Sequence, residues 1–405
     1  MDQLIGVFGI FILLAIAMAM SNNRVAISWR LVFWGLSLQL TFAIIILNTP
    51  IGIPFFGAID IFVKNLLSFS DAGSDFLFKS FGQNIVEAPL MNFAFRILPT
   101  LIFFSSLINV LYHLGVMQFL VKSTARIMQK TMGTSGSETL CISGNIFVGQ
   151  TEAPLLVQPF VSKMTNSELT AVMIGGFATV AGGVMAMYVS MLGNIDGIAG
   201  HLLAASIMSA PAALVVAKII YPETEESQTK GDLTISIKND DDNIMEALST
   251  GATNGMKLAA NVAAMLIAFV ATIAMVNAVL SLFGLSLEQI LGWIFSPLAW
   301  VMGVPWQEAY VVGSLMGKKL VLTELIAFGD LSTLISDNVL SERSAIISSY
   351  ALCGFANFAS IGIQLGGIGG IAPERRKDIA QLGLKTMFGG AIASWLTATI
   401  AGLLI

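Results

Sequence analysis

Charged side chains are scarce in this sequence. Asp, Glu, Lys and Arg make up 11% of the 405 residues, while hydrophobic residues make up 56% and the mean hydropathy is +0.82. A soluble globular domain carries about 25% charged residues. Because the deficit extends along the whole chain, the composition excludes an ordinary soluble protein and predicts a polytopic membrane protein.

Cysteine and histidine are scarce as well, and the net charge is modest. Cys141 and Cys353 each stand in an apolar stretch, so we expect packed thiols and not a disulfide framework. His113 and His201 lie near the ends of apolar runs, where we expect neither to relay protons. The net charge of −5 gives no reason to expect nucleic acid as a partner.

Long apolar runs take the place of the missing charge. About twenty apolar residues form a helix that crosses a hydrocarbon core of about 30 Å, and we expect about eight such spans. They lie near residues 4–20, 28–47, 97–116, 168–190, 198–220, 257–283, 345–370 and 382–404. The first run has no basic residue before it and no small-residue cleavage site, which favours a retained span over a signal peptide. The intervening stretches 48–75 and 284–306 are interpreted as linkers.

Two further apolar regions, 137–162 and 307–330, are interrupted at their centres by polar residues. The interruptions read GQTEAP (149–154) and KKLVLTEL (318–325). Each flank is too short to cross a bilayer alone, which is typical of re-entrant segments. Pro154 also removes a backbone hydrogen bond from a continuing helix. We therefore predict two re-entrant helical hairpins.

The positions of Lys and Arg support this layout. They gather at 24–30, at 122–163, at 218–257 and at 375–385, and the positive-inside rule makes these places cytoplasmic. That assignment requires both interrupted regions to enter and leave on one side. The first hairpin then opens to the cytoplasm, the second opens to the outside, and both termini lie outside.

Basic residues recur every fourth position in residues 117–130, at Lys122, Arg126 and Lys130, among apolar neighbours. This spacing predicts one amphipathic helix that lies on the membrane surface.

Each predicted hairpin is followed by an interrupted span. After the first hairpin, Gly175-Gly176 and AGG (181–183) are expected to break the helix, with Thr179 between them. After the second, the interruption reads GFANFASIG (354–362). Two hairpin and broken-helix units of opposite orientation are the pattern of an inverted-repeat transporter with its site near the membrane midplane. The predicted fold class is thus an all-α polytopic membrane protein with an inverted repeat.

Polar side chains at the two hairpin tips indicate a ligand cavity. A carboxylate at the centre of a membrane helix costs about 2.5–3.5 kcal/mol on insertion scales. Glu152 and Glu324 are therefore interpreted as facing a water-filled cavity; the alternative places each tip near the headgroups, where a carboxylate costs little. The candidate lining comprises Gln150, Thr151, Glu152, Glu324, Asn357 and Ser360, without an Arg. Because anionic substrates usually recruit Arg, this set favours a neutral, hydroxyl-bearing solute, with Phe355 and Leu258 as an apolar wall or as plain core residues.

Asn145 and Thr179 offer hard oxygen ligands of the kind that sodium prefers, together with carbonyls freed at a helix break. Ordinary interhelical hydrogen bonding by these two side chains is the alternative. A membrane-embedded enzyme using the two carboxylates as acid and base is a rival function. A carrier of another neutral polar solute is a second rival.

Several stretches of this chain resemble the concentrative nucleoside transporters. They are FAFRILPTLIFFSSLINVLYHLGVMQ (93–118), NIFVGQTEAPLLVQPF (145–160), ATVAGGV (178–184), PLAWVMGVPWQEA (297–309) and ALCGFANFASI (351–361). The resemblance covers essentially the whole chain, and the lack of extra amino-terminal spans is similar to the bacterial branch. It implies a sodium-coupled nucleoside symporter of the inner (plasma) membrane that works by elevator-type alternating access. It also implies a homotrimer, no enzymatic activity and no cofactor beyond the sodium ion.

The resemblance further implies roles for single residues. Gln150, Thr151 and Glu152 match nucleobase-binding positions; Glu324, Asn357 and Ser360 match ribose-binding positions; Val184, Leu258 and Phe355 match the apolar lining. Asn145, Val148, Thr179 and Val180 match the sodium site, the two valines through their backbone carbonyls. The implied domains are a scaffold of 1–116 with about 254–284, a first transport repeat of 117–220, a cytoplasmic linker of 221–253, and a second transport repeat of 285–405.

This sequence departs from the family pattern at three places. Thr323-Glu324-Leu325-Ile326-Ala327 stands where Asn-Glu-Phe-Val-Ala is usual, Thr179 where Ser is common, and Ala359 where Ser is common. The preference for purine or pyrimidine nucleosides therefore stays open. Because Thr179 keeps a hydroxyl, sodium is favoured as the coupling ion, with a proton-coupled carrier as the alternative.

Overall fold

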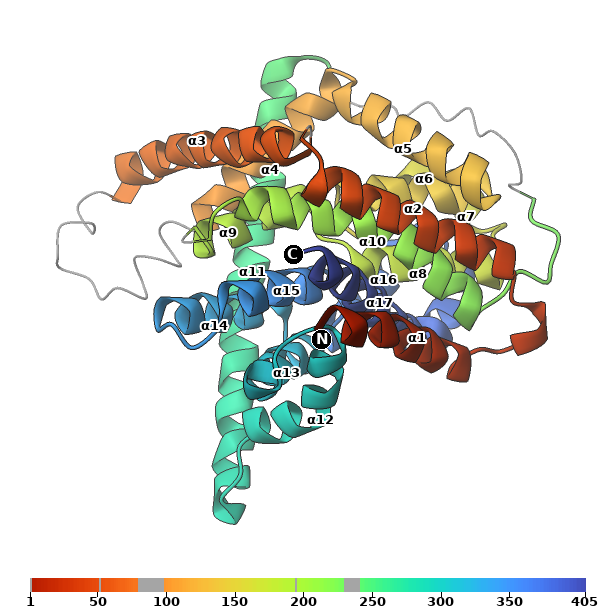
Figure 1. The fold of residues 1–405 in the computed structure, drawn as a ribbon. Coiled ribbons are helices and arrows are strands. Elements are labelled where there is room, and N and C mark those ends of the chain that lie inside the picture. The colour runs from red at the N-terminus through yellow and green to blue at the C-terminus, as the bar shows by residue number, and fades with distance from the viewer. Residues whose placement is uncertain (1, 51, 79–97, 194, 229–240) are drawn as a thin grey trace.

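The computed structural model describes residues 2–50, 52–78, 98–193, 195–228 and 241–405 (Figure 1). In this described part all regular structure is helical, without strands. The all-α prediction is confirmed.

The first elements are α1 (Asp2–Ala19), the short 3-10 helix η1 (Arg24–Ala26), α2 (Trp29–Asn48), α3 (Gly52–Phe78) and α4 (Leu98–His113). Helices α1, α2 and α4 fall on the first three predicted spans, except that residue 97 lies outside the described residues. Helix α3 occupies the stretch that we interpreted as the linker 48–75, and that interpretation is wrong. The Thr49 hydroxyl accepts a hydrogen bond from Gly52 N (2.8 Å), which satisfies one of the free N–H groups at the start of α3.

Helix α5 (Val116–Met132) is bent by 77° from α4. The chain turns at Gly115, whose φ of +78° is one that glycine adopts without steric cost. One face of α5 is buried, including Val121 and Met128, while Lys122, Arg126 and Lys130 are exposed. The predicted amphipathic helix is therefore present; its position on the membrane surface stays a prediction.

The first interrupted region begins with a regular arm and ends with an irregular one. Helix α6 (Gly136–Asn145) is followed by turns, by the 3-10 helix η3 (Ala153–Val157) and by the single turn α7 (Gln158–Val161). Pro154 and Pro159 lack the N–H groups that a continuous second helix would need. The break at the predicted tip has this cause.

The next span is broken at only one of the two places that we expected. Helix α8 (Asn166–Ala178) runs straight through Gly175-Gly176, and the break comes at 179–181, before α9 (Gly182–Met191). The prediction of a break at the glycine pair is wrong. These glycines allow close packing instead, because a Cβ at Gly175 would lie 2.6 Å from Cγ1 of Ile142 on α6.

The remaining described elements are helices as well. They are α10 (Ile198–Ile220), α11 (Ile244–Leu280), η4 (Ser281–Phe283), α12 (Leu287–Val301), α13 (Trp306–Val321), α14 (Glu324–Ser336), α15 (Glu342–Leu352), α16 (Phe358–Ile371), η5 (Pro373–Arg375) and α17 (Arg376–Leu404). The second hairpin is α13–α14, with its tip at 322–323, and the second broken span is α15–α16.

Helix α12 occupies the stretch that we interpreted as the linker 284–306, so that interpretation is wrong as well. A capping box of Ser286 and Gln289 starts the helix. Helix α12 packs along α13 and is bent by 82° from the segment Met275–Phe283.

The order of elements in the two halves of the chain is the same. A bent pair (α4–α5, α11–α12) precedes a hairpin, then a broken helix (α8–α9, α15–α16), then a continuous helix (α10, α17). Among the described residues, 4 segments are long and apolar enough to cross a membrane, or up to 6 if each bent pair is one span. They are Trp29–Asn48, Asn166–Met191, Ile198–Ile220 and Pro373–Leu404. The total of about eight spans stays a prediction.

The buried centre of the molecule lies where α8, α10 and α17 pack against one another. Figure 1 shows α11 as a long helix that runs from the top to the bottom of the view, and it packs along α4.

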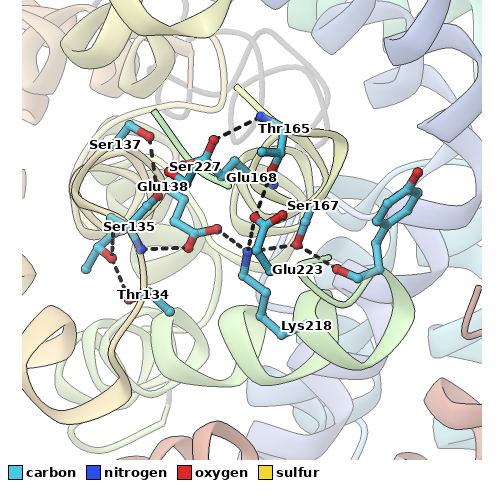
Figure 2. Close-up of polar contacts among 12 residues, drawn as sticks. Thr134, Ser135, Ser137, Glu138, Thr165, Ser167, Glu168, Lys218, Glu223 and Ser227 are labelled. Atoms are coloured by element: carbon cyan, nitrogen blue, oxygen red, sulfur yellow. Dashed lines mark hydrogen bonds and ion pairs between the residues drawn. The ribbon is translucent and has the colours of Figure 1, made fainter. Parts of the chain in front are cut away.

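A buried ion pair joins the base of the first hairpin to the end of α10 (Figure 2). Lys218 Nζ lies 2.7 Å from the Glu138 carboxylate and donates a hydrogen bond to Ser167 Oγ at 2.8 Å. Glu223 lies 3.6 Å from the same ammonium and accepts a hydrogen bond from Thr165 Oγ1 (2.8 Å).

The predicted linker 221–253 thus begins as a docked segment. Ser227 donates to Glu168 at the start of α8 (2.6 Å). The centre of the predicted linker, 229–240, lies outside the described residues, and the end of the linker belongs to α11.

We predict that Lys218→Met lowers the free energy of unfolding by about 3–5 kcal/mol, because it leaves the Glu138 carboxylate buried without its partner. Thermal unfolding of the detergent-solubilised protein measures this as a lowered Tm. The matched control is Lys163→Met at an exposed lysine, and adding Glu138→Gln to Lys218→Met should recover part of the loss. An unchanged Tm in the single variant contradicts the assigned role.

Candidate functional site

A cavity of about 150 Å³ lies between the two hairpin tips, the two helix breaks and α11. All nine predicted substrate residues line it: Gln150, Thr151, Glu152, Val184, Leu258, Glu324, Phe355, Asn357 and Ser360. Leu258 reaches it from α11, and the others come from the hairpins and broken helices. The structure brings these side chains together; their roles in binding stay predictions.

The carboxylates of the two tips line the same cavity. Glu152 Oε2 accepts a hydrogen bond from Gly149 N (2.6 Å), and Glu152 as a residue is exposed. Glu324 is buried and uses both oxygens, accepting from Tyr188 Oη and from Asn357 Nδ2 at 2.8 Å each. The alternative, in which the tips lie apart at the headgroup layers, does not fit a cavity that both tips line.

Two helix N-termini meet at Glu324. Glu324 is the first residue of α14, where free N–H groups and the helix dipole stabilise a negative charge. Asn357 is the N-cap of α16: its Oδ1 accepts a hydrogen bond from Ser360 N (2.8 Å), while its Nδ2 donates to Glu324. The side chain of Asn357 therefore fixes the start of α16 and the position of the carboxylate together.

Two residues that the sequence analysis did not select hold the predicted ones in place. Tyr188, which donates to Glu324, is fixed by stacking on Phe328, with ring centroids 4.1 Å apart. Gln364 Nε2 donates to Gln150 Oε1 and to the Met173 carbonyl, at 3.0 Å each. A lone amide in an apolar helix is a signal that could have revealed Gln364, whereas Tyr188 offers no such signal in its apolar run.

The residues predicted to bind sodium lie at the end of α6 and at the break of α8–α9. Asn145 is 1% exposed, and neither polar atom of its side chain has a hydrogen-bond partner within the described part of the chain. Thr179 Oγ1 donates to the Gly175 carbonyl (2.9 Å), which leaves its oxygen able to accept a cation. Val148 and Val180 are buried.

The two segments touch, because Gly182 N donates to the Phe147 carbonyl (3.0 Å). A buried amide without partners normally costs about 1–3 kcal/mol. Coordination of a hard cation by the Asn145 oxygen, a hydroxyl and freed carbonyls would offset that cost, so these residues fit a sodium ion. The alternative of interhelical hydrogen bonding finds no partner for Asn145 in the described structure.

Comparison with known proteins places the whole chain in one family. Residues 8–81 match the model "Na+ dependent nucleoside transporter N-terminus", residues 94–195 match "Nucleoside recognition", and residues 201–402 match "Na+ dependent nucleoside transporter C-terminus". The chain belongs to the concentrative nucleoside transporter family. The resemblance seen in the sequence is confirmed, and the chain is a membrane protein of this family.

Relatives in the concentrative nucleoside transporter family come from bacteria and animals. An uncharacterized transporter of Haemophilus influenzae is 43% identical over 100% of this chain and 98% of its own length. Sodium/nucleoside cotransporter 1 of Rattus norvegicus and that of Homo sapiens are each 42% identical over 100% of this chain, which spans 64% of their length.

Solved structures of the same family match the fold. CNTnw in an inward-facing substrate-bound state has a TM-score of 0.91 and 42% identity, covering 100% of this chain and 98% of CNTnw. A CNTnw variant in an outward-facing state has a TM-score of 0.90 and 41% identity, with the same coverage. Because these relatives are named as transporters, they speak against a membrane-embedded enzyme.

We predict that a cysteine at Leu258, which is 36% exposed, reacts with a small water-soluble thiol reagent. The native Cys141 and Cys353 are 0% exposed and should stay unmodified, so the wild-type protein provides the background. The matched control is Leu214→Cys, at a leucine of 0% exposure on α10. Intact-protein mass spectrometry counts the modified thiols. If Leu258→Cys reacts no more than Leu214→Cys does, the exposure of residue 258 at the cavity is contradicted.

Proposed function

We propose that this protein is a sodium-coupled nucleoside symporter that imports nucleosides. The observation that supports it best is the meeting of two polar hairpin tips in one cavity with an apolar wall. A nucleoside has matching parts: a flat base with polar edges, and a sugar with paired hydroxyls. The cavity presents carboxylates and amides to an uncharged ligand, and its lining includes no Arg or Lys.

The first tip is proposed to hold the base. Gln364 engages the carbonyl oxygen of Gln150, so the amide nitrogen of Gln150 is the group left to donate to an acceptor on the base edge. Thr151 and Glu152 add a hydroxyl and an acceptor at the same end, and Val184 and Phe355 supply apolar contact.

The second tip is proposed to hold the sugar. An ionised carboxylate has about four acceptor positions, and Tyr188 and Asn357 use one on each oxygen of Glu324. The remaining positions suit two neighbouring hydroxyl donors. Ser360, whose backbone is fixed by Asn357, lies beside them on the cavity wall.

Transport is proposed to follow an elevator-type path in an inverted-repeat fold. Most of the lining belongs to the proposed transport repeats 117–220 and 285–405, whereas Leu258 belongs to the scaffold segment 254–284. A cavity at this boundary would travel with the hairpins while α11 stays in place. The shared element order of the two halves supports the repeat. We further propose a homotrimer in the bacterial inner membrane.

Sodium is proposed as the coupling ion, with protons as the alternative. An ion held by Asn145 and the freed carbonyls near Val148 and Thr179 would fix the chain that leads into Gln150. Binding of the ion would then pre-organise the base site, which couples the two ligands energetically.

Uptake of labelled uridine and adenosine into proteoliposomes, with and without an inward sodium gradient, tests the proposal. We expect gradient-dependent accumulation of at least one nucleoside. Accumulation driven only by a proton gradient would select the proton-coupled alternative, and no accumulation under either gradient would refute nucleoside symport.

We predict that Glu324→Gln lowers uptake at least roughly tenfold, because hydrogen bonds to a charged group contribute about 1.5–3 kcal/mol each. The matched control is Glu308→Gln, at a carboxylate that accepts from Ser341 outside the cavity. Equal uptake by the two variants would remove Glu324 from the sugar site.

We predict that Asn145→Ala raises the sodium concentration for half-maximal uptake roughly tenfold, equivalent to about 1.4 kcal/mol. Asn166→Ala, at an amide that accepts from Arg375 at the start of α8, is the control. Sodium titrations of uptake at saturating nucleoside measure the effect; the same sodium dependence in both variants would argue against the ion site.

A further inference from the structure

The second hairpin contains a buried positive charge that the proposed function does not use. Lys319 lies on α13 and its side chain is 0% exposed. Its Nζ donates a hydrogen bond to the Ala351 carbonyl at 2.9 Å. Burial of an ammonium is costly unless charges or dipoles compensate for the lost water, so the surroundings of Lys319 must supply that compensation.

The compensation comes from the break between α15 and α16. Ala351 is in the last turn of α15, where carbonyls lack helical partners and the helix dipole is negative. Cys353 N donates to the neighbouring carbonyls of Ser349 and Tyr350, and Lys319 takes the Ala351 oxygen. The Glu324 carboxylate at the same tip adds an attractive electrostatic interaction with the ammonium.

The first hairpin has a group in the corresponding position of the element order. Asn145 lies shortly before the tip carboxylate Glu152, and Phe147, two residues after Asn145, accepts a hydrogen bond from Gly182 N at the break of α8–α9. Lys319 lies shortly before Glu324 and contacts the break of the helix that follows the second hairpin. The first position offers the unpaired amide oxygen of Asn145 to a cation, whereas the second position supplies the cation itself.

We propose that the Lys319 ammonium is a covalently tethered replacement for a second coupling ion. It neutralises the freed carbonyl end of α15, as a sodium ion at the first hairpin would do for the break of α8–α9. This inference rests on the proposed function. Its consequence is that one sodium ion, and therefore one positive charge, moves with each uncharged nucleoside.

The wild-type protein tests the stoichiometry without any substitution. Reconstituted protein is held at set membrane potentials with fixed sodium and uridine (or adenosine) gradients, and the potential at which net flux vanishes gives the charge moved per nucleoside. A ratio of one is expected. A ratio of two overturns the proposal, because a second ion would then have a place that Lys319 does not fill.

Lys319→Asn tests the residue itself. The change removes the ammonium and leaves an amide like that of Asn145, so a sodium ion can enter the vacated position. We expect the Hill coefficient for sodium to rise from about 1 toward 2, the number of sites then available, and the charge moved per nucleoside to rise with it. A side chain that only supported the fold would lower the amount of active protein without changing either quantity.

The matched control is Lys318→Asn, at the neighbouring ammonium. Lys318 pairs with Asp330 (2.6 Å) and Glu288 (3.6 Å) away from the helix break, so its removal should leave the Hill coefficient at about 1.

An unchanged Hill coefficient in Lys319→Asn overturns the inference while wild-type uptake upholds the proposed function. If wild-type protein takes up no nucleoside, the proposed function itself fails. If Lys319→Asn does not fold, the wild-type charge ratio still decides.

Discussion

Backbone groups at a helix break inside a bilayer have no water to bind, so the protein must provide a partner for each of them. Both halves of this chain contain such a break. The candidate site is built from the side chains that provide partners for the backbone groups there. Asn357 caps the start of α16 and holds Glu324 with the same side chain. Lys319 takes a carbonyl at the end of α15. The polar groups that shape the cavity are therefore the groups that make broken helices tolerable in a membrane protein.

The polar groups near the two breaks are paired to different extents, and the two ends of the site differ as a result. The second hairpin consists of two regular helices, and its charges and dipoles are matched within the protein. The first hairpin has an irregular second arm and leaves the Asn145 amide unpaired. The unpaired amide of Asn145 is the reason for proposing a sodium ion near the first tip, whereas Lys319 supplies the positive charge near the second.

Much of this arrangement could be predicted from the sequence, because carboxylates and amides in apolar surroundings are costly and therefore informative. The two interrupted regions and the amphipathic helix at 117–130 are present in the structure, and the nine candidate residues line one cavity. The stretches of α3 and α12 are interpreted as linkers because α3 contains Asp60 and Lys64 and α12, with 15 residues, is shorter than a membrane span. The glycine pair at 175–176 was misread because glycine serves close packing as readily as it ends a helix. Tyr188 stayed hidden because only the fold brings its hydroxyl to Glu324.

The close contact at Gly176 has an evolutionary consequence. A Cβ there would lie 2.9 Å from Cβ of Gln150 and 2.8 Å from Nε2 of Gln364, so even one methyl group would push the paired amides apart. Homologues that change the residue at any one of these three positions should carry compensating changes at the other two. Gln150 and the two residues that pack against it should therefore change together, whereas the wall that we propose binds the sugar should vary more independently.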